Sequence, residues 1–165
     1  MLFRSVPALV TPRGPLTEVP VILGWVATMY PEAHLKPDGD FFTFSEMQSF
    51  NMYLATTVHI AFAHLFRPER WADSDTTKAE MKAKVPSNLA LVFKLIEDRL
   101  GDGRPWVCGD QYTVADPYLY LFARWLERDG AGGSSAMPLT RAHRSRMQAR
   151  PAVQKVLAVE GIAPV

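Results

Sequence analysis

The sequence predicts a helix-dominated fold with a few short strands near its N-terminus. Long segments with apolar residues at helical spacing fill most of the chain after residue 20, whereas short apolar runs bounded by turn residues occur only before it. The chain has 165 residues, of which 48% are hydrophobic and 21% charged, so it can bury one sizeable core. We therefore expect a mainly α protein whose strands lie at the front.

A β-hairpin followed by a helix is predicted at the N-terminal end. The apolar run at residues 5–10 precedes the turn sequence Thr-Pro-Arg-Gly at residues 11–14, and a second short strand follows. Pro20 suits the first position of a helix. The apolar stripe continues to Met29, and the helix should end near Tyr30 and Pro31.

Two long helices are predicted next, at residues 43–66 and 76–100, after a linker at 36–40. The first should be capped by Thr43 or Ser45. Its first apolar stripe comprises Phe44, Met47, Leu54, Val58, Ala61 and Leu65. A second stripe, at Phe50, Tyr53 and Ile60, predicts contact with a further partner. In the second helix Pro86 should kink or break the backbone hydrogen bonding.

A buried helix is predicted to begin at Thr113. The Thr113 side chain can accept a hydrogen bond from the amide of Asp116, while the Asp116 carboxylate accepts from the amide of Thr113. The residues that follow leave no polar face, so neighbours should surround the helix. They include Leu119, Leu121, Phe122, Trp125 and Leu126. A flexible loop at 130–135 and helices at 138–149 and 151–160 should follow.

Composition and charge argue against several function classes. The formal net charge is +1, which gives no general attraction to nucleic acid, and the local basic run near the C-terminus is interpreted as a solvated helix face. Its members are Arg141, Arg144, Arg146 and Arg150. The longest apolar run is too short to cross a membrane, and the first ten residues do not form a signal peptide, which favours a cytoplasmic location. The single Cys108 is predicted to be buried, and no Cys/His cluster has metal-site spacing.

Two motifs together resemble the helical domain of glutathione S-transferases, particularly the bacterial beta class. They are Gly109-Asp-Gln-Tyr-Thr-Val-Ala-Asp116 and Arg150-Pro-Ala-Val-Gln-Lys-Val156, at the family's order and separation. The resemblance implies an all-α C-terminal domain at 43–165 after a partial thioredoxin-like ββα domain at 1–36. It also implies conjugation of glutathione, as the substrate, to a small hydrophobic electrophile, by a homodimer that needs no metal and contacts neither nucleic acid nor membrane.

The resemblance extends to residues that bind glutathione. Val6-Pro7 is similar to the family's Val-Pro, in which the proline is cis and the preceding backbone pairs with the cysteinyl part of glutathione. Thr17-Glu18-Val19-Pro20 is similar to the sequence that binds the γ-glutamyl end, although Val19 lacks the hydroxyl of the family's serine. The alternative for Glu18 is an ordinary acidic residue at a helix N-terminus.

His59 lies in a segment similar to the beta-class sequence whose histidine faces the active site, and it is the candidate catalytic residue. Met52, Phe62 and Trp125 are expected to line a hydrophobic pocket beside it. A partly buried structural histidine is the alternative for His59, and a core position is the alternative for Trp125. Ile60 replaces the family's lysine.

The family residue that activates the sulfur of glutathione precedes the region matched here, so impaired conjugation is expected. A non-catalytic binding or dimerisation module, and a fragment of a full-length transferase, are the alternatives. On this interpretation the strand at residues 6–10 lacks a neighbour on one side. Such an edge favours a dimer or larger aggregate over a monomer.

Overall fold

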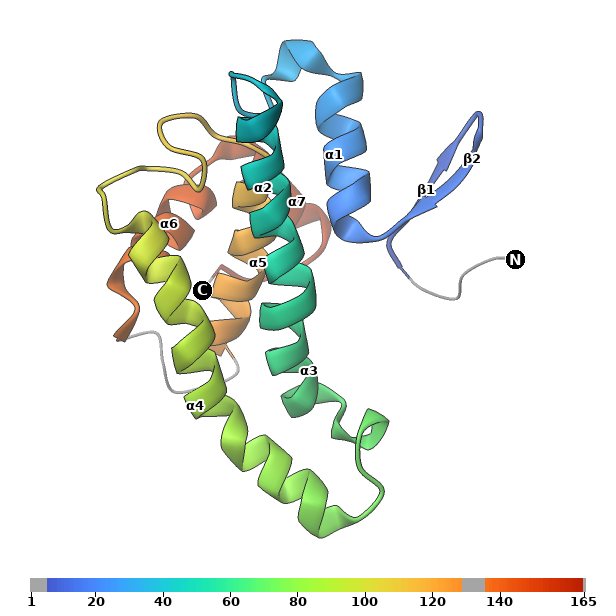
Figure 1. Cartoon of the computed structure of the whole chain (residues 1–165), viewed down its shortest axis with the longest axis vertical. Helices are drawn as coiled ribbons and strands as arrows, with labels where there is room; N and C mark the ends of the chain where they lie inside the picture. The colour runs from blue at the N-terminus through green and yellow to red at the C-terminus, as the bar shows by residue number, and fades with distance from the viewer. Residues whose placement is uncertain (1–5, 129–135, 165) are drawn as a thin grey trace.

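A computed structural model describes residues 6–128 and 136–164, and it is mainly helical with one small sheet, as predicted (Figure 1). The predicted loop at 130–135 lies outside the described residues. The strands are β1 (Ala8–Thr11) and β2 (Gly14–Thr17). The helices are α1 (Val19–Met29), α2 (Phe41–Tyr53), α3 (His59–Phe66), α4 (Asp75–Leu100), α5 (Ala115–Arg128), α6 (Pro138–Gln148) and α7 (Pro151–Val159). Single helical turns lie at Pro31–Ala33, Leu54–Val58 and Pro68–Arg70.

The predicted hairpin and first helix are confirmed. β1 and β2 pair antiparallel, with Ala8 opposite Thr17 and Thr11 opposite Gly14. Gly14 has a φ of 120°, which glycine adopts far more easily than other residues. The Thr11 hydroxyl donates to the carbonyl of Gly14 at 2.7 Å and closes the turn. Figure 1 shows the hairpin projecting from the helices, with α1 leading back to them.

The long helix predicted at 43–66 forms, but its cap is Asp40 rather than Thr43 or Ser45. The Asp40 carboxylate accepts from the amide of Thr43 at 3.0 Å, so Thr43 already lies inside the first turn. Between α2 and α3 the chain makes one π-helical turn at Leu54–Val58. A π turn holds more residues than an α turn, so it rotates the faces of α3 relative to those of α2.

The second stripe of this helix packs inside the chain, which corrects the expectation of a partner contact there. Phe50 is 4% exposed and belongs to the core. The Tyr53 hydroxyl donates to the carbonyl of Val92 in α4 at 2.8 Å. Only Ile60 is substantially exposed. Phe50 and Tyr53 therefore pack α2 against α4, whereas Ile60 stays at the surface.

Pro86 does not break α4. The helix runs from Asp75 to Leu100, and its N-terminus is capped by the Ser74 hydroxyl, which accepts from the amide of Thr77 at 3.2 Å. Proline removes one backbone donor, but Val85 and Leu89 on either side are fully buried. Their packing holds both turns in place.

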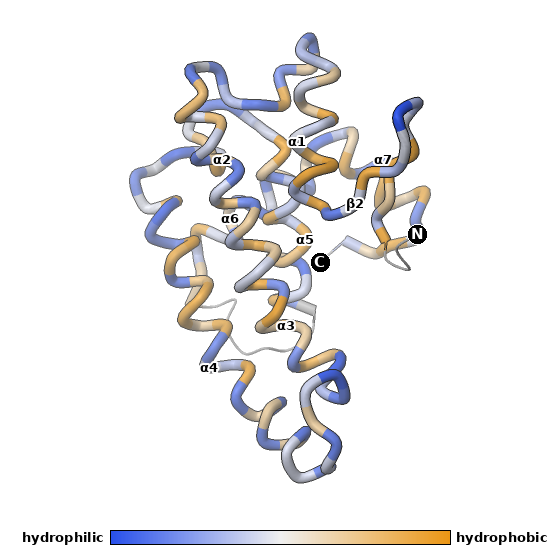
Figure 2. Tube along the Cα trace, turned by 45° about the vertical axis from the view of Figure 1, so that its right-hand side comes forward, coloured by the Kyte–Doolittle hydropathy of each residue, from blue (hydrophilic) through white to orange (hydrophobic). Residues whose placement is uncertain are grey.

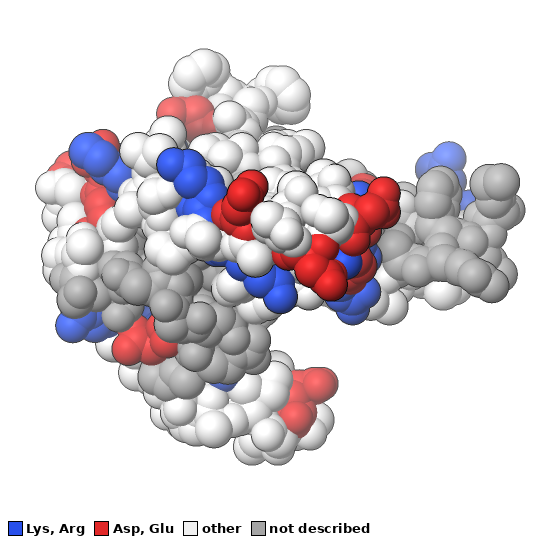
Figure 3. Space-filling model, turned by 90° about the horizontal axis from the view of Figure 1, so that it is seen from below, with Lys and Arg blue, Asp and Glu red and all other residues white. Residues whose placement is uncertain are grey.

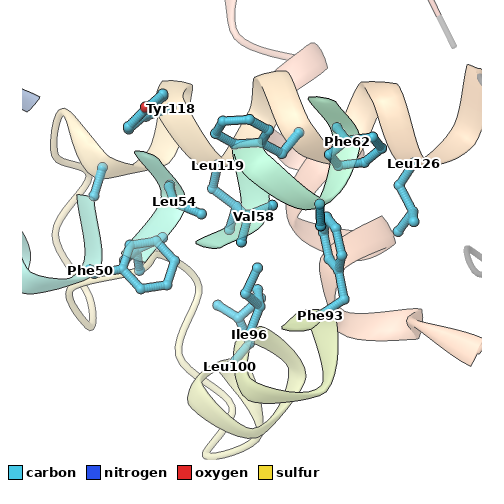
Figure 4. Close-up of a cluster of buried hydrophobic side chains, with 14 of the residues drawn as sticks. Phe50, Leu54, Val58, Phe62, Phe93, Ile96, Leu100, Tyr118, Leu119 and Leu126 are labelled. Atoms are coloured by element: carbon cyan, nitrogen blue, oxygen red, sulfur yellow. The ribbon is translucent and has the colours of Figure 1, made fainter. Parts of the chain in front are cut away.

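The core lies between α5 and the helices α2, α3 and α4 (Figure 4). Large side chains with almost no exposure fill it, and hydrophobic residues recur along α1, α3 and α5 (Figure 2). Those labelled in Figure 4 include Leu54, Val58, Phe62, Phe93, Ile96 and Leu119. α5 is therefore central and nearly wholly buried, as its lack of a polar face predicts.

The N-terminus of α5 is more elaborate than a two-residue cap. The Asp116 carboxylate accepts from the amide of Thr113 at 2.7 Å, as expected. However, the Thr113 hydroxyl accepts from the amide of Ala115 at 3.3 Å rather than from that of Asp116. The other Asp116 oxygen accepts from the amide of Val107 at 2.9 Å and lies 2.9 Å from His143 Nε2. Asp116 and His143 are both buried, so this carboxylate joins α5, α6 and the preceding loop.

Arg144 and Arg150 pack on the protein, which corrects the predicted solvated face for these two residues, whereas Arg141 and Arg146 are exposed as predicted. Arg144 is 8% exposed and pairs with Glu127 at 3.6 Å. Arg146 lies over the Trp106 ring, and Arg150 lies over Tyr112 at 3.6 Å from the ring centre. Positive and negative side chains are interspersed on the face seen in Figure 3. No described helix is long and apolar enough to span a membrane.

Candidate functional site

A cavity of about 670 Å³ opens between the start of the hairpin, the N-terminus of α1, the α3 segment and α5. It brings together residues far apart in the sequence. They are Val6, Pro7, Glu18, Val19, Pro20, Ala55, His59, Ala63, Phe66, Arg67, Arg70 and Tyr118. The four residues expected to bind glutathione, and the candidate catalytic histidine, all line it.

The N-terminal side of the cavity is built by backbone geometry. The Val6–Pro7 peptide bond is cis, as the resemblance implies. Glu18 has a φ of 69°, a value that non-glycine residues seldom adopt, immediately before α1 begins at Val19. No side chain caps this helix end, and its first intrahelical bond runs from the amide of Ile22 to the Glu18 carbonyl. The amides of Val19 and Val21 therefore precede the helix's hydrogen-bonded turns and make its N-terminus suitable for an anion.

His59 forms the wall opposite, where α3 begins. Its ring packs against Phe122 and Trp125 of α5, with ring centres 5.9 and 5.8 Å away. Burial lowers the pKa of the imidazole, and the positive charge of Arg70 lowers it further. His59 is consequently neutral at pH 7, and one ring nitrogen can accept a proton.

Tyr118 contributes a phenol from α5. Burial, together with the negative charge of Glu18, raises the pKa of this hydroxyl to about 12. The phenol therefore stays protonated at neutral pH and can donate a hydrogen bond into the cavity. Glu18 and Tyr118 both line the cavity.

Three residues expected in the hydrophobic pocket do not line this cavity. Phe62 is fully buried among Phe93 and Phe122 of the core, and Met52 is 48% exposed on α2. Trp125 packs behind His59, in the core position that was the alternative. The π-helical turn lies between Met52 and His59 and changes the face that each presents, which accounts for Met52. The lining positions are 55, 59, 63 and 66.

Arg67, Arg70 and Tyr118 line the cavity but were not recognised in the sequence as site residues. Tyr118 lies in the apolar run of α5, which predicts only burial. The two arginines flank Pro68-Glu69 and lie three residues apart, and this spacing is the feature of the sequence that could have indicated them as site residues. Whether these two side chains reach the cavity depends on the turn after α3, and the helical periodicity of the sequence does not reveal that turn.

Comparison with known proteins agrees with this arrangement. The family model for the glutathione S-transferase C-terminal domain matches residues 53–151. Glutathione S-transferase GstA of Escherichia coli O157:H7 is 32% identical over 96% of this chain and 75% of that protein.

Solved structures show the same fold. A Sulfitobacter glutathione transferase homologue with bound glutathione aligns with a TM-score of 0.84 and 36% identity, over 96% of this chain and 75% of that chain. A beta-class enzyme from Sphingomonas chungbukensis aligns with a TM-score of 0.81 and 32% identity, over the same shares of the two chains. The helical bundle, the hairpin with its cis proline and the family model all agree, and the chain belongs to the glutathione S-transferase family.

Proposed function

We propose that this protein binds glutathione in the cavity between the hairpin and α3, and that it conjugates the thiol to a small electrophile. The observation that carries the proposal is the convergence of Val6–Pro7, Glu18 and His59 on one cavity. Family membership and the glutathione bound to the Sulfitobacter homologue support it.

The N-terminal side of the cavity provides complementary groups for glutathione. The Glu18 carboxylate would pair with the γ-glutamyl ammonium, while the open amides at the start of α1 would bind the neighbouring carboxylate. The backbone of Val6 would pair with the cysteinyl part. This arrangement directs the sulfur toward His59 and Tyr118.

Conjugation requires a thiolate that attacks the electrophile. Neutral His59 is the group in the cavity that can accept the thiol proton, and the Tyr118 phenol can donate a hydrogen bond to the sulfur. Among the described residues, those that line the cavity include no cysteine or serine. We expect slow conjugation, with His59 in the catalytic role and glutathione as substrate rather than resident cofactor.

Isothermal titration calorimetry of the full chain with glutathione tests the binding step. Glu18→Gln should weaken binding about tenfold or more, because a charge-assisted hydrogen bond contributes ~1.5–3 kcal/mol. Glu32→Gln, on an exposed turn outside the cavity, is the matched control and should bind normally. Equal affinity in both variants would contradict the assignment of Glu18. For conjugation, His59→Gln should lower kcat more than it raises KM for glutathione.

We also propose that the chain forms a homodimer in the cytoplasm, with a thioredoxin-like part at 1–36 and a helical domain at 43–165. Large exposed apolar side chains on α2 and α4 support association, because a second copy could remove them from water. They include Phe41, Phe42, Leu91 and Leu95, which are 51 to 82% exposed. Light scattering that gave the 18.5 kDa mass of one chain at micromolar concentration would contradict the dimer.

A further inference from the structure

Arg67 and Arg70 lie on the side of the cavity formed by the end of α3. Arg67 follows the last residue of α3, and Arg70 is the last residue of the 3₁₀ turn Pro68–Arg70. Arg67 precedes this turn directly, with a φ of −139° that lies outside the helical range, so the chain changes direction between the two arginines. Both arginines line the cavity, and the charge of Arg70 acts on His59 in the same cavity.

The turn that carries these arginines is anchored. Pro68 is buried, and the amide of Arg70 donates to the carbonyl of Arg67 at 3.1 Å. The amides of Trp71 and the following alanine both donate to the carbonyl of Pro68, at 3.0 and 3.1 Å. The Trp71 ring packs on that of His64 with 4.6 Å between ring centres. The backbone position of each arginine is therefore fixed.

The positive charges of Arg67 and Arg70 are not neutralised within the described part of the chain. Neither guanidinium has an ion pair or a hydrogen bond to another described residue. By contrast, Arg104 pairs with Asp102 and Arg144 pairs with Glu127. The only carboxylate among the described lining residues is Glu18, which the proposed function assigns to glutathione.

We propose that Arg67 and Arg70 bind the carboxylate of the second substrate, so that the protein prefers anionic electrophiles over neutral ones of the same shape. This inference rests on the proposed function. A guanidinium matches a carboxylate through two parallel hydrogen bonds, and two guanidiniums on one rigid turn can bind both of its oxygens. The apolar body of the electrophile then lies against Ala63 and Phe66, near His59.

A suitable probe is 4-chloro-3,5-dinitrobenzoate, with its methyl ester as the neutral counterpart. In the reaction the glutathione thiolate forms a C–S bond at the carbon that carries chlorine, and the C–Cl bond breaks with chloride leaving as the anion. Acid and ester react at the same carbon. A difference between them therefore reports on recognition of the carboxylate.

The experiment measures the Kd of the acid, the ester and glutathione separately, by quenching of tryptophan fluorescence in the full chain. We expect the acid to bind about tenfold more tightly than the ester (~1.4 kcal/mol), with a preference that shrinks at high salt. Arg67→Gln/Arg70→Gln should remove this preference and leave the ester Kd unchanged. The control Arg13→Gln/Lys82→Gln, with both residues exposed and outside the cavity, removes the same charge and should keep the preference.

Three results separate this inference from the proposed function. Equal binding of acid and ester to the unmodified protein would overturn the inference, even where glutathione binds normally. A loss of glutathione affinity in Arg67→Gln/Arg70→Gln as large as the loss for the acid would also overturn it, because the arginines would then bind a carboxylate of glutathione. Acid preference without glutathione binding would support the anion site while refuting the proposed function.

Discussion

Replacement of Asp116 tests the buried network at the start of α5. Its carboxylate accepts from the amides of Thr113 and Val107 and contacts His143 Nε2, at 2.7, 2.9 and 2.9 Å. Asp116→Ala leaves these three donors without an acceptor in the core. A buried polar group that loses its partner costs ~1–3 kcal/mol, and three such groups lose theirs together here. We expect Asp116→Ala to lower the free energy of unfolding by about 3–5 kcal/mol.

Urea unfolding followed by circular dichroism measures this change. Asp116→Asn keeps one acceptor oxygen and should cost less, about 2–4 kcal/mol, so it remains measurable where the alanine variant does not fold. Thr113→Ala removes a hydroxyl that accepts from the amide of Ala115 at 3.3 Å and lies 3.4 and 3.5 Å from Asp116 Oδ2 and Cys108 Sγ, and it should cost about 0.5–2 kcal/mol. Asp98→Ala, at an exposed ion pair with Lys94, should leave the midpoint unchanged. A loss under 1 kcal/mol for Asp116→Ala would refute the network's structural role.

Three further predictions concern the core, a titration and the thiol. Phe62→Ala should cost about 3–5 kcal/mol in the same unfolding assay, whereas Phe42→Ala, at a residue that is 70% exposed, should change little. The pKa of His59 by NMR should lie below about 6.5 and rise in Arg70→Gln, with any stability contribution of His59 present above pH 6.5 and lost as pH falls. A titration midpoint of His59 at or above pH 6.5 would contradict the burial of its imidazole ring. Burial raises the pKa of Cys108, so its alkylation at pH 8 should be slower than that of free glutathione and should accelerate at higher pH. Equal alkylation rates for Cys108 and glutathione would contradict the burial of this thiol.

The helices and the hairpin were predictable because local chemistry determines them. Apolar residues repeat at helical spacing, and turn residues separate the two strands. The Asp116–Thr113 contact is also local, since the two residues are three apart. By contrast, Val107 and His143 reach Asp116 through loops that no pattern describes. The buried pair with His143 was consequently missed.

The candidate site was predictable only in part, for a physical reason in α2 and α3. The family resemblance indicated Val6, Glu18 and His59, all of which line the cavity. Extrapolation along a regular helix then placed Met52 on the same face as His59, but the π-helical turn at Leu54–Val58 lies between the two residues and changes the helical phase. Helical periodicity carries no information about such a turn. The side of the helix that faces the cavity had to be observed.

The most direct test of the central claim is an NMR titration of the ¹⁵N-labelled full chain with glutathione. The account predicts saturable shifts of the amides of Val6, Glu18 and Val19 and of the ring of His59, because these residues surround one cavity. Amides around Cys108, in a separate polar hollow of about 280 Å³, should not move. Shifts confined to that hollow, or no saturable shifts at glutathione concentrations of several millimolar, would contradict the claim that this cavity binds glutathione.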